Sequence, residues 1–281
     1  MGIENAKTFT LGGELKVHRL GFGAMRLTGD GMWGEPRNRA EALRVLRRAV
    51  ELGVNFIDTA DSYGPEVSEE LIAEALYPYP PDLVIATKGG LLRPGPGQWE
   101  PHGDPAHLRR ACEGSLRRLR LNRIDLYQFH APDPKVPLER SLEELARLRD
   151  EGKIRLVGVS NFDVDQLERA IRIVPIASVQ NRFNLGDRSS MDVLGWCEKR
   201  RIAFIPWRPL GLDGVDVRAV DAIAQRHGAT RGQVALAWLL ALSPVMLPIP
   251  GTSSMAHLEE NVAAADLGLS PEEVAELTAL A

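Results

Sequence analysis

The chain has 281 residues, of which 44% are hydrophobic, and it carries a formal net charge of −4 with acidic and basic residues interleaved. This length accommodates a single α/β barrel or two domains, and the charge pattern offers no basic face for a nucleic acid. The N-terminus lacks a signal-peptide core and no run approaches transmembrane length, so we expect a soluble, cytoplasmic protein without a membrane partner. Cys112 and Cys197 lie far apart in helical patterns outside any metal-binding motif, and no metal site is expected.

The first predicted elements are two short alternating strands within residues 7–20, separated by Gly12 and Gly13. Paired glycines between alternating strands are typical of a β-hairpin, which we expect to cap one end of the main fold. Residues 20–25 form a short apolar strand. Residues 37–52 then have helical spacing, and Gly53 ends that helix.

Strand and helix patterns alternate along the rest of the chain. The expected strands are residues 20–25, 55–58, 83–88, 124–130, 154–160, 178–180, 203–207 and 245–249. The expected helices are residues 37–52, 68–76, 104–119, 138–151, 164–172, 191–200, 216–227, 231–242, 255–265 and 271–280. Eight such units indicate an α/β fold, a closed parallel (β/α)8 TIM barrel with an N-terminal β-hairpin cap, as one domain over residues 1–281. A doubly wound sheet is the alternative, but no G-x-G-x-x-G motif joins a first strand to a helix.

The longest non-periodic stretches follow the first and third barrel strands. They span residues 28–36 and 89–103, and each contains Gly, Pro and one tryptophan, Trp33 or Trp99. Long loops at one end of a barrel are typical pocket walls, so both tryptophans are candidate substrate contacts. The alternative is that the tryptophans only pack these loops down.

Polar residues stand where the predicted strands end. They are Asp58, Lys88, His130, Ser160 with Asn161, Gln180 and Trp207, and the eighth strand leads into PGTSS. Any one of them has an ordinary explanation, such as a turn residue or a structural histidine. Their recurrence at the carboxyl ends of consecutive barrel strands predicts a functional site, because unpartnered buried charges are costly.

The chemistry follows from the residue types. Asp58, Lys88, His130 and Tyr63 converge without a serine or cysteine nucleophile, a His-x-His metal pair or two facing carboxylates, which disfavours acyl transfer, metallohydrolase and glycosidase chemistry. Proton donation to a carbonyl fits: Tyr63 is the candidate general acid, with its pKa lowered by the Lys88 ammonium, which Asp58 holds. His130 then orients the carbonyl oxygen. A nicotinamide carboxamide can form hydrogen bonds with Ser160, Asn161 and Gln180, and its ring can stack on Trp207.

At this point the sequence resembles the aldo-keto reductase family. The motifs LGFGAMRL, GVNFIDTADSYG, VIATK, DLYQFH, GVSNF, WRPLG and IPGTSSMAHLEENVAA stand in that family's order over essentially the whole chain. The resemblance implies NAD(P)H-dependent reduction of aldehydes or ketones to alcohols. It also implies a catalytic tetrad of Asp58, Tyr63, Lys88 and His130. Among subgroups, the chain looks most like bacterial pyridoxal reductase-like (pyridoxine 4-dehydrogenase-like) members, which makes pyridoxal a candidate substrate.

The resemblance also suggests binding residues. The expected cofactor contacts are Gly23, Met25, Asp58, Ser160, Asn161, Gln180, Trp207, Pro209, Leu210, Gly211, Ile249, Gly251, Thr252, Ser253, His257, Glu260 and Asn261. The expected substrate contacts are Trp33, Tyr63, Trp99 and His130. The sequence departs from the family at several positions: Trp207 replaces a common tyrosine, Arg182 replaces glutamate, and Gly251 and His257 replace basic residues near the adenosine phosphate.

The cofactor is expected to be NADPH/NADP⁺, with NADH as a weaker alternative. Thr252, Ser253 and Ser254 precede a helix that opens near Met255, where hydroxyls and free N–H groups can meet a 2′-phosphate. His257 lies one turn into that helix and would face the same spot. The alternative is that Ser254 only caps the helix.

Two other functions stay open from the sequence. A reductase-fold subunit with little catalysis would bind the nucleotide as a sensor, and a barrel lyase or aldolase would use Lys88 as a Schiff base. The stretch after the last helix is short, so we expect an open site that accepts several aromatic aldehydes. The partner is then a small-molecule carbonyl substrate, and the protein is expected to be a monomer or weak oligomer.

Overall fold

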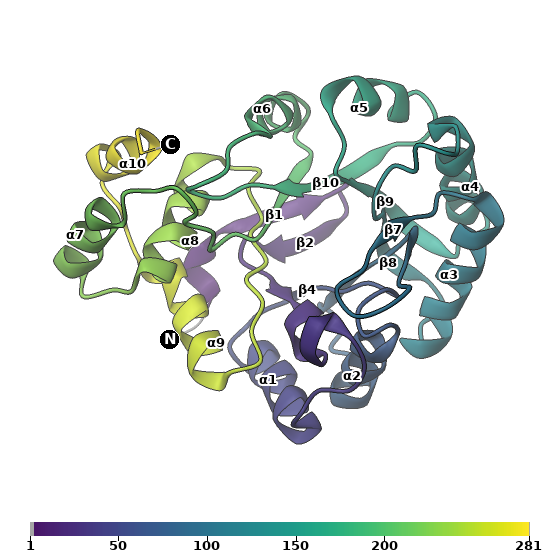
Figure 1. The fold of residues 1–281 in the computed structure, drawn as a ribbon, viewed down its shortest axis with the longest axis horizontal. Helices are drawn as coiled ribbons and strands as arrows, with labels where there is room; N and C mark the ends of the chain where they lie inside the picture. Colours follow the sequence, from purple (N-terminus) through teal and green to yellow (C-terminus); the bar gives the residue numbers. More distant parts are fainter. Residues whose placement is uncertain (1–2, 281) are drawn as a thin grey trace.

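The structure is a computed structural model that describes residues 3–280, and its centre is a curled parallel sheet surrounded by helices (Figure 1). Seven strands pair in the order β11-β10-β9-β8-β5-β4-β3. Their bounds are β3 (Phe22–Gly23), β4 (Phe56–Asp58), β5 (Val84–Gly89), β8 (Ile124–Phe129), β9 (Ile154–Ser160), β10 (Ile176–Arg182) and β11 (Ala203–Trp207). The predicted α/β barrel is thereby confirmed, with seven of the eight expected strands in place.

The predicted strand at residues 245–249 is wrong as a regular strand, although this segment closes the ring. The Phe204 N–H donates to the Val245 carbonyl and the Leu247 N–H donates to the Phe204 carbonyl, while the Gly21 N–H donates to the Pro248 carbonyl on the other side. Proline has no N–H to donate, so Pro248 and Pro250 interrupt the ladder. The segment therefore joins β11 to the β3 edge without regular pairing.

The first predicted strand is shorter than expected. Only Phe22–Gly23 is extended, and the chain then turns into the 3₁₀ helix η2 (Ala24–Leu27). Residues 20–25 are apolar throughout, and such a run does not distinguish a strand from a buried 3₁₀ turn.

The helices cover the outside of the ring, as predicted, with ends shifted by at most a few residues. They are α1 (Arg39–Glu51), α2 (Val67–Leu76), α3 (Pro105–Arg118), α4 (Leu138–Asp150), α5 (Val164–Ala170), α6 (Met191–Arg200), α7 (Val217–His227), α8 (Arg231–Leu242), α9 (Met255–Ala263) and α10 (Pro271–Thr278). Side chains that accept backbone hydrogen bonds begin several of them: Asn38 caps α1, Asp104 caps α3 and Thr230 caps α8. No helix in residues 3–280 is long and apolar enough to cross a membrane.

The predicted N-terminal hairpin closes one end of the barrel. Strands β1 (Thr8–Leu11) and β2 (Leu15–His18) pair antiparallel and lie across the centre of the ring in Figure 1. Leu11 and Val17 are fully buried in a cluster with residues from the starts of the barrel strands, including Phe56 and Leu126. The hairpin thus excludes water from the amino-terminal end, and the opposite end is left for the polar residues.

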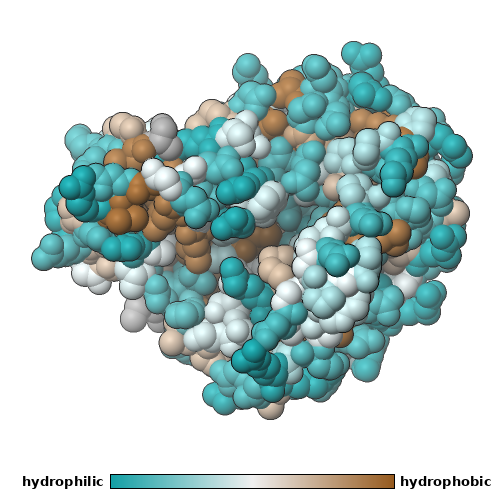
Figure 2. Space-filling view, in the orientation of Figure 1, coloured by the Kyte–Doolittle hydropathy of each residue, from teal (hydrophilic) through white to brown (hydrophobic). Residues whose placement is uncertain are grey.

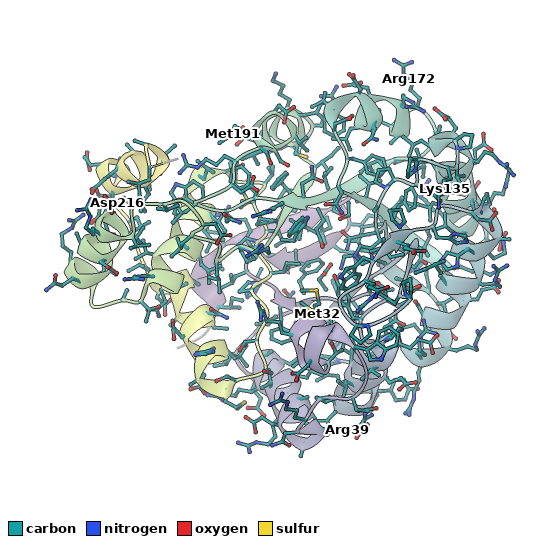
Figure 3. The ribbon with its side chains drawn as sticks, in the orientation of Figure 1. Met32, Arg39, Lys135, Arg172, Met191 and Asp216 are labelled. Carbon is teal, nitrogen blue, oxygen red and sulfur yellow. The ribbon has the colours of Figure 1, made fainter. Side chains whose placement is uncertain are left out.

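The long loops lie at that opposite, carboxyl-terminal end. The loop before α1 contains η3 (Asp30–Met32), and the loop after β5 contains a small antiparallel ribbon, β6 (Leu91–Leu92) with β7 (Glu100–Pro101). Figure 3 places Met32 over the middle of the ring, whereas Arg172 and Met191 lie on its rim. In the space-filling view this face has a hollow near its centre with hydrophobic residues at the floor (Figure 2).

Candidate active site

The innermost part of the site is a buried ion pair between Lys88 and Asp58. Asp58 ends β4, Lys88 stands near the end of β5, and their side chains are 2% and 0% exposed. Lys88 Nζ donates to Asp58 Oδ1 over 2.5 Å and to the Thr59 carbonyl over 2.8 Å. Burial opposes the charge of Lys88, but Asp58 and Tyr63 outweigh it, and the pKa of Lys88 is raised above its ordinary value. Lys88 is therefore a cation held in the barrel interior.

Two glutamine amides complete the surroundings of Asp58. Gln128 Nε2 and Gln180 Nε2 each donate to Asp58 Oδ2 over 2.9 Å. Each carboxylate oxygen thus accepts at least one hydrogen bond, which offsets the cost of burying the charge. Gln128 was not among the predicted site residues. A period of two along β8 points Gln128 and the residue that follows Phe129 to the same face, and this signal was present in the sequence.

Tyr63 lies above the ion pair. Lys88 Nζ donates to the Tyr63 hydroxyl over 3.3 Å, and the tyrosine is 6% exposed. Gly64 has a φ of 106°, and a Cβ there would meet Val67 at 2.5 Å, so this position requires glycine. The tight turn between β4 and α2 thereby directs the phenol back over the barrel mouth.

His130 stands beside the phenol. The two ring centroids are 5.7 Å apart with the planes at 80°, and the Ser62 hydroxyl lies 3.3 Å from His130 Nδ1. Burial lowers the pKa of His130 well below its ordinary value, and the charges of Lys88 and Arg93 lower it further. The imidazole is therefore neutral, and when Ser62 donates to Nδ1, the other ring nitrogen carries the hydrogen.

The expected pKa of Tyr63 is wrong in its net direction. Burial raises the pKa of Tyr63 above its ordinary value, and Lys88 lowers it only in part. The sequence shows the neighbouring cation but not how completely the barrel removes the phenol from water, which disfavours the charged phenolate. The phenol is therefore protonated at neutral pH, as proton donation requires.

A cavity of about 390 Å³ and a neighbouring one of about 510 Å³ open at this end of the barrel. The larger one contains Tyr63 and Trp99, and most of the expected cofactor contacts line it: Gly23, Met25, Asp58, Ser160, Asn161, Gln180, Trp207, Pro209, Leu210, Gly211, Ile249 and Gly251. Met32, Arg26, Arg208 and Pro250 line it as well and were not predicted. Arg26 and Met32 come from η2 and η3, and the other two come from loops. The sequence does not specify the paths of these segments.

The polar wall of the larger cavity is held by a chain of hydrogen bonds. Trp207 Nε1 donates to Asn161 Oδ1 over 3.0 Å, and Asn161 Nδ2 donates to the His130 carbonyl over 3.1 Å. Ser160 Oγ donates to the Gln180 carbonyl over 2.8 Å. Asn161 has a φ of 62°, a left-handed conformation that asparagine tolerates better than most residues. These contacts orient the Trp207 ring and the amides toward the opening.

Another part of the cavity wall is free of side chains where two backbone segments meet. A Cβ at Gly23 would lie 2.7 Å from the Ile249 carbonyl oxygen, and one at Gly251 would lie 2.5 Å from the Gly23 carbonyl oxygen. Both positions therefore need glycine, and the wall between them presents backbone to the cavity. The backbone at Gly23 and Gly251 and the side chains of Asn161 and Trp207 thus line the same cavity.

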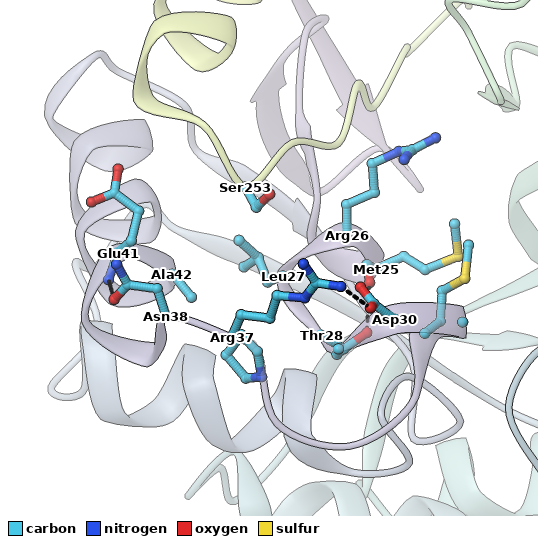
Figure 4. Close-up of a pocket in the computed structure, with 14 residues that line it drawn as sticks. Met25, Arg26, Leu27, Thr28, Asp30, Arg37, Asn38, Glu41, Ala42 and Ser253 are labelled. Atoms are coloured by element: carbon cyan, nitrogen blue, oxygen red, sulfur yellow. Dashed lines mark hydrogen bonds and ion pairs between the residues drawn. The ribbon is translucent and has the colours of Figure 1, made fainter.

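The predicted phosphate segment lies beside the larger cavity rather than in it. Ser253 lines the cavity of about 390 Å³ together with Arg26 and Arg37, and Figure 4 shows Arg37 paired with Asp30 there. Ser254 accepts from the His257 N–H and caps α9, which confirms the capping interpretation of that residue. The His257 side chain is exposed.

Three other expected cofactor contacts in this segment, Thr252, Glu260 and Asn261, have different partners. Thr252 is buried, and its Oγ1 accepts from the Ser254 N–H. Glu260 Oε1 accepts from Thr230 Oγ1, which joins α9 to α8, and Asn261 is buried. None of these three lines either cavity.

The two candidate substrate contacts Trp33 and Trp99 differ in position. It pairs with Gly64 in an isolated bridge and lies 5.6 Å from the Arg93 guanidinium, and it lines neither cavity. Trp99 does line the larger cavity, with its ring centroid 6.1 Å from that of Tyr63. Of the two tryptophans, Trp99 alone lines one of these two cavities.

Arg182 forms ion pairs with two aspartates near Trp207. Its guanidinium pairs with Asp187 at 2.8 Å and Asp213 at 3.7 Å, and it lies 5.7 Å from the Trp207 ring centroid. Arg208 also pairs with Asp213, at 3.3 Å. Arg182 therefore joins the loops on both sides of Trp207.

Comparison with known proteins supports the resemblance found in the sequence. The chain is 52% identical over 267 residues to an uncharacterized oxidoreductase of Schizosaccharomyces pombe, covering 94% of this chain and 87% of the relative. It is 43% identical over 281 residues to pyridoxine 4-dehydrogenase of Escherichia coli, covering 97% of this chain and 98% of the relative. The likeness to pyridoxine 4-dehydrogenase-like members is confirmed, and the fungal oxidoreductase is more similar still.

Solved structures share the fold over nearly the whole chain. A thermostable aldo-keto reductase in complex with the inhibitor epalrestat superposes with a TM-score of 0.85 at 34% identity, covering 98% of this chain and 100% of that one. An aldo-keto reductase of Klebsiella pneumoniae in complex with NADP and acetate gives a TM-score of 0.81 at 30% identity, covering 96% and 94%. The sequence model of the aldo/keto reductase family matches residues 19–281. With these matches, the chain belongs to the aldo/keto reductase family and is an oxidoreductase.

Proposed function

We propose that this protein reduces aldehydes or ketones to alcohols with NADPH, and that Tyr63 is the general acid. The observation that carries the proposal is the position of Lys88, which donates to both Asp58 and the Tyr63 hydroxyl at the floor of the larger cavity. A phenol that faces a cavity and contacts a fixed cation can release its proton to a substrate oxygen, because the cation stabilises the phenolate that remains.

The other residues of the site orient the substrate. Neutral His130 can donate a hydrogen bond to the carbonyl oxygen from the ring nitrogen that does not face Ser62. Tyr63 then gives its proton to that oxygen, and Lys88 remains charged throughout because Asp58 stays paired with it. Trp99 and Met32 line the cavity beside the phenol.

NADPH is the proposed cofactor, and when bound it supplies the hydride that the carbonyl carbon receives. Trp207, Asn161 and the backbone at Gly23 and Gly251 form a site that suits the nicotinamide. The related Klebsiella structure holds NADP, which supports the same cofactor here. Ser253 and the N–H groups that open α9 are the proposed contacts of the 2′-phosphate.

The two alternative functions are less well supported. A Schiff-base enzyme needs a neutral lysine with free access to substrate, whereas Lys88 is fully buried, paired and has a raised pKa. A nucleotide sensor without catalysis would not need Lys88 and His130 to contact a tyrosine that lines the cavity. The likeness to pyridoxine 4-dehydrogenase makes pyridoxal the first substrate to test.

The test is a panel of aldehydes that includes pyridoxal and 4-nitrobenzaldehyde, assayed with NADPH and with NADH. We expect steady NADPH oxidation with several aromatic aldehydes and a weaker reaction with NADH. Tyr63→Phe serves as the control for reduction that does not use the site. If the wild-type protein binds NADPH but consumes none with any aldehyde or ketone, the sensor function is correct instead.

A further inference from the structure

A single guanidinium, that of Arg93, connects three loops around the larger cavity. Arg93 follows β6, and its Nε donates to the Gln98 carbonyl of its own loop over 2.8 Å. Its Nη1 donates to the Met32 carbonyl over 2.9 Å and to the Ser62 carbonyl over 2.8 Å. Its Nη2 donates to the Gly31 carbonyl over 3.0 Å. Four carbonyls from three separate segments of the chain thus share one side chain.

Arg93 also holds an aromatic wall of the cavity. Its guanidinium carbon lies 3.6 Å from the Trp99 ring centroid, so the cation covers one face of the indole. The same ring lies 6.1 Å from Tyr63 and 6.4 Å from His130, measured between centroids. Trp99 is therefore held between Arg93 and the reacting groups.

No carboxylate in residues 3–280 forms an ion pair with Arg93. The backbone carbonyls and the indole are its partners, so the N–H groups of the side chain join the loops and do not form an ion pair. Only arginine presents five N–H groups in a rigid fork, and a lysine nitrogen cannot reach three segments at once.

We propose that Arg93 is the positioning residue that builds the substrate wall and thereby selects flat aromatic carbonyl substrates. It acts on the cavity through three residues: Met32 by its carbonyl, Trp99 by its ring, and Tyr63 through the adjacent Ser62. This inference rests on the proposed function, since it concerns which carbonyl compounds that site accepts.

The main test compares Arg93→Ala with the wild type on two substrates. For 4-nitrobenzaldehyde we expect KM to rise about 10-fold while kcat changes less than about 3-fold, because ground-state contacts with Trp99 are lost. For propanal, which is too small to use the indole face, we expect KM to change less than about 2-fold. Equal effects on both substrates, or an unchanged KM for the aromatic one, would overturn the proposal.

Further variants test whether the effect of Arg93 depends on its guanidinium and on Trp99. Arg93→Lys keeps the charge and should behave like Arg93→Ala, and full rescue by lysine would show that the fork is not needed. Arg93→Ala combined with Trp99→Ala should match Trp99→Ala alone, since contacting residues are not additive, whereas additive losses would contradict action through Trp99. Arg172→Ala, which removes an exposed arginine on the rim (Figure 3), is the matched control.

A second measurement needs no turnover. The Gly64 N–H donates to the Met32 carbonyl and the Gly97 N–H donates to the Gly31 carbonyl, so these two amides report on how the loops are joined. In Arg93→Ala we expect both to exchange hydrogen at least about 10-fold faster, with the amides of β8 unchanged. If the wild type reduces no carbonyl while this exchange still rises, the proposed function fails and the positioning role remains. Unchanged exchange at both glycines refutes the positioning role itself.

Discussion

Lys88 Nζ lies 2.5 Å from Asp58 Oδ1 in a part of the barrel that excludes water almost completely. The pair is held from both sides, because the lysine also contacts Tyr63 while the aspartate also accepts from Gln128 and Gln180. A change to one partner alone leaves an uncompensated charge in the interior.

Lys88→Met should therefore destabilise the fold by about 3–5 kcal/mol, the usual cost of breaking a buried ion pair from one side. The double variant Asp58→Asn with Lys88→Met should lose less, because neither charge remains. Urea unfolding at pH 7 measures both. A single variant as stable as the wild type would contradict the stabilising role of this ion pair.

The pH profile tests how Lys88 acts on the general acid. Tyr63 must be protonated to donate, so the reduction rate falls as pH rises through the pKa of this phenol. Lys88 lowers that pKa against the larger effect of burial, so Lys88→Met should move the fall to higher pH. The measurement is kcat against pH for variants that are shown to be folded. A fall at the same pH in both proteins would remove Lys88 from this role.

Tyr63→Phe should keep the cavity but lose its proton donor. We expect kcat to decrease by about 10²–10⁴-fold, the usual contribution of general acid catalysis. The Kd of NADPH, measured by fluorescence, should stay within about 2-fold, since only one hydroxyl is removed. A deuterated cofactor shows whether hydride transfer limits the rate. With that established, a variant keeping more than half of the wild-type turnover would defeat the assignment.

The two loop tryptophans provide a matched pair. Trp99 lines the larger cavity and Trp33 does not, although both lie near Arg93. Trp99→Ala should therefore lower kcat/KM for aromatic aldehydes by about 10-fold or more, and Trp33→Ala by much less. Steady-state kinetics on the same substrate panel decides this. Equal losses would mean that loop packing, rather than contact with substrate, sets the activity.

The cofactor preference tests the phosphate site. We expect NADPH to bind more tightly than NADH, because Ser253 and the start of α9 offer donors to a 2′-phosphate. His257 lies in the first turn of α9, where its imidazole can add a donor to the same phosphate, so the preference should be smaller in His257→Ala. The Kd of each cofactor for the wild type and for this variant measures the effect. A preference that His257→Ala leaves unchanged would place the phosphate elsewhere.

The order of strands and helices was readable from the sequence because apolar runs and helical spacing are local properties. The same is true of the polar residues at the strand ends: a parallel barrel brings all of its carboxyl ends to one rim, so Asp58, Lys88 and His130 had to lie near each other. Residues 245–249 show the limit of this reasoning. Their apolar run is typical of a strand, but Pro248 within it and Pro250 after it have no N–H to pair.

The sequence by itself determined the barrel, the identity of the buried ion pair and the tyrosine beside it, since these follow from residue type, period and spacing. Only the tertiary structure decided that Trp99 and not Trp33 lines the cavity, that Arg93 joins three loops, and that burial outweighs Lys88 in setting the pKa of Tyr63. The physical reason is common to all three. Loop paths and exclusion of water depend on contacts between residues far apart in the chain, and no local pattern encodes them.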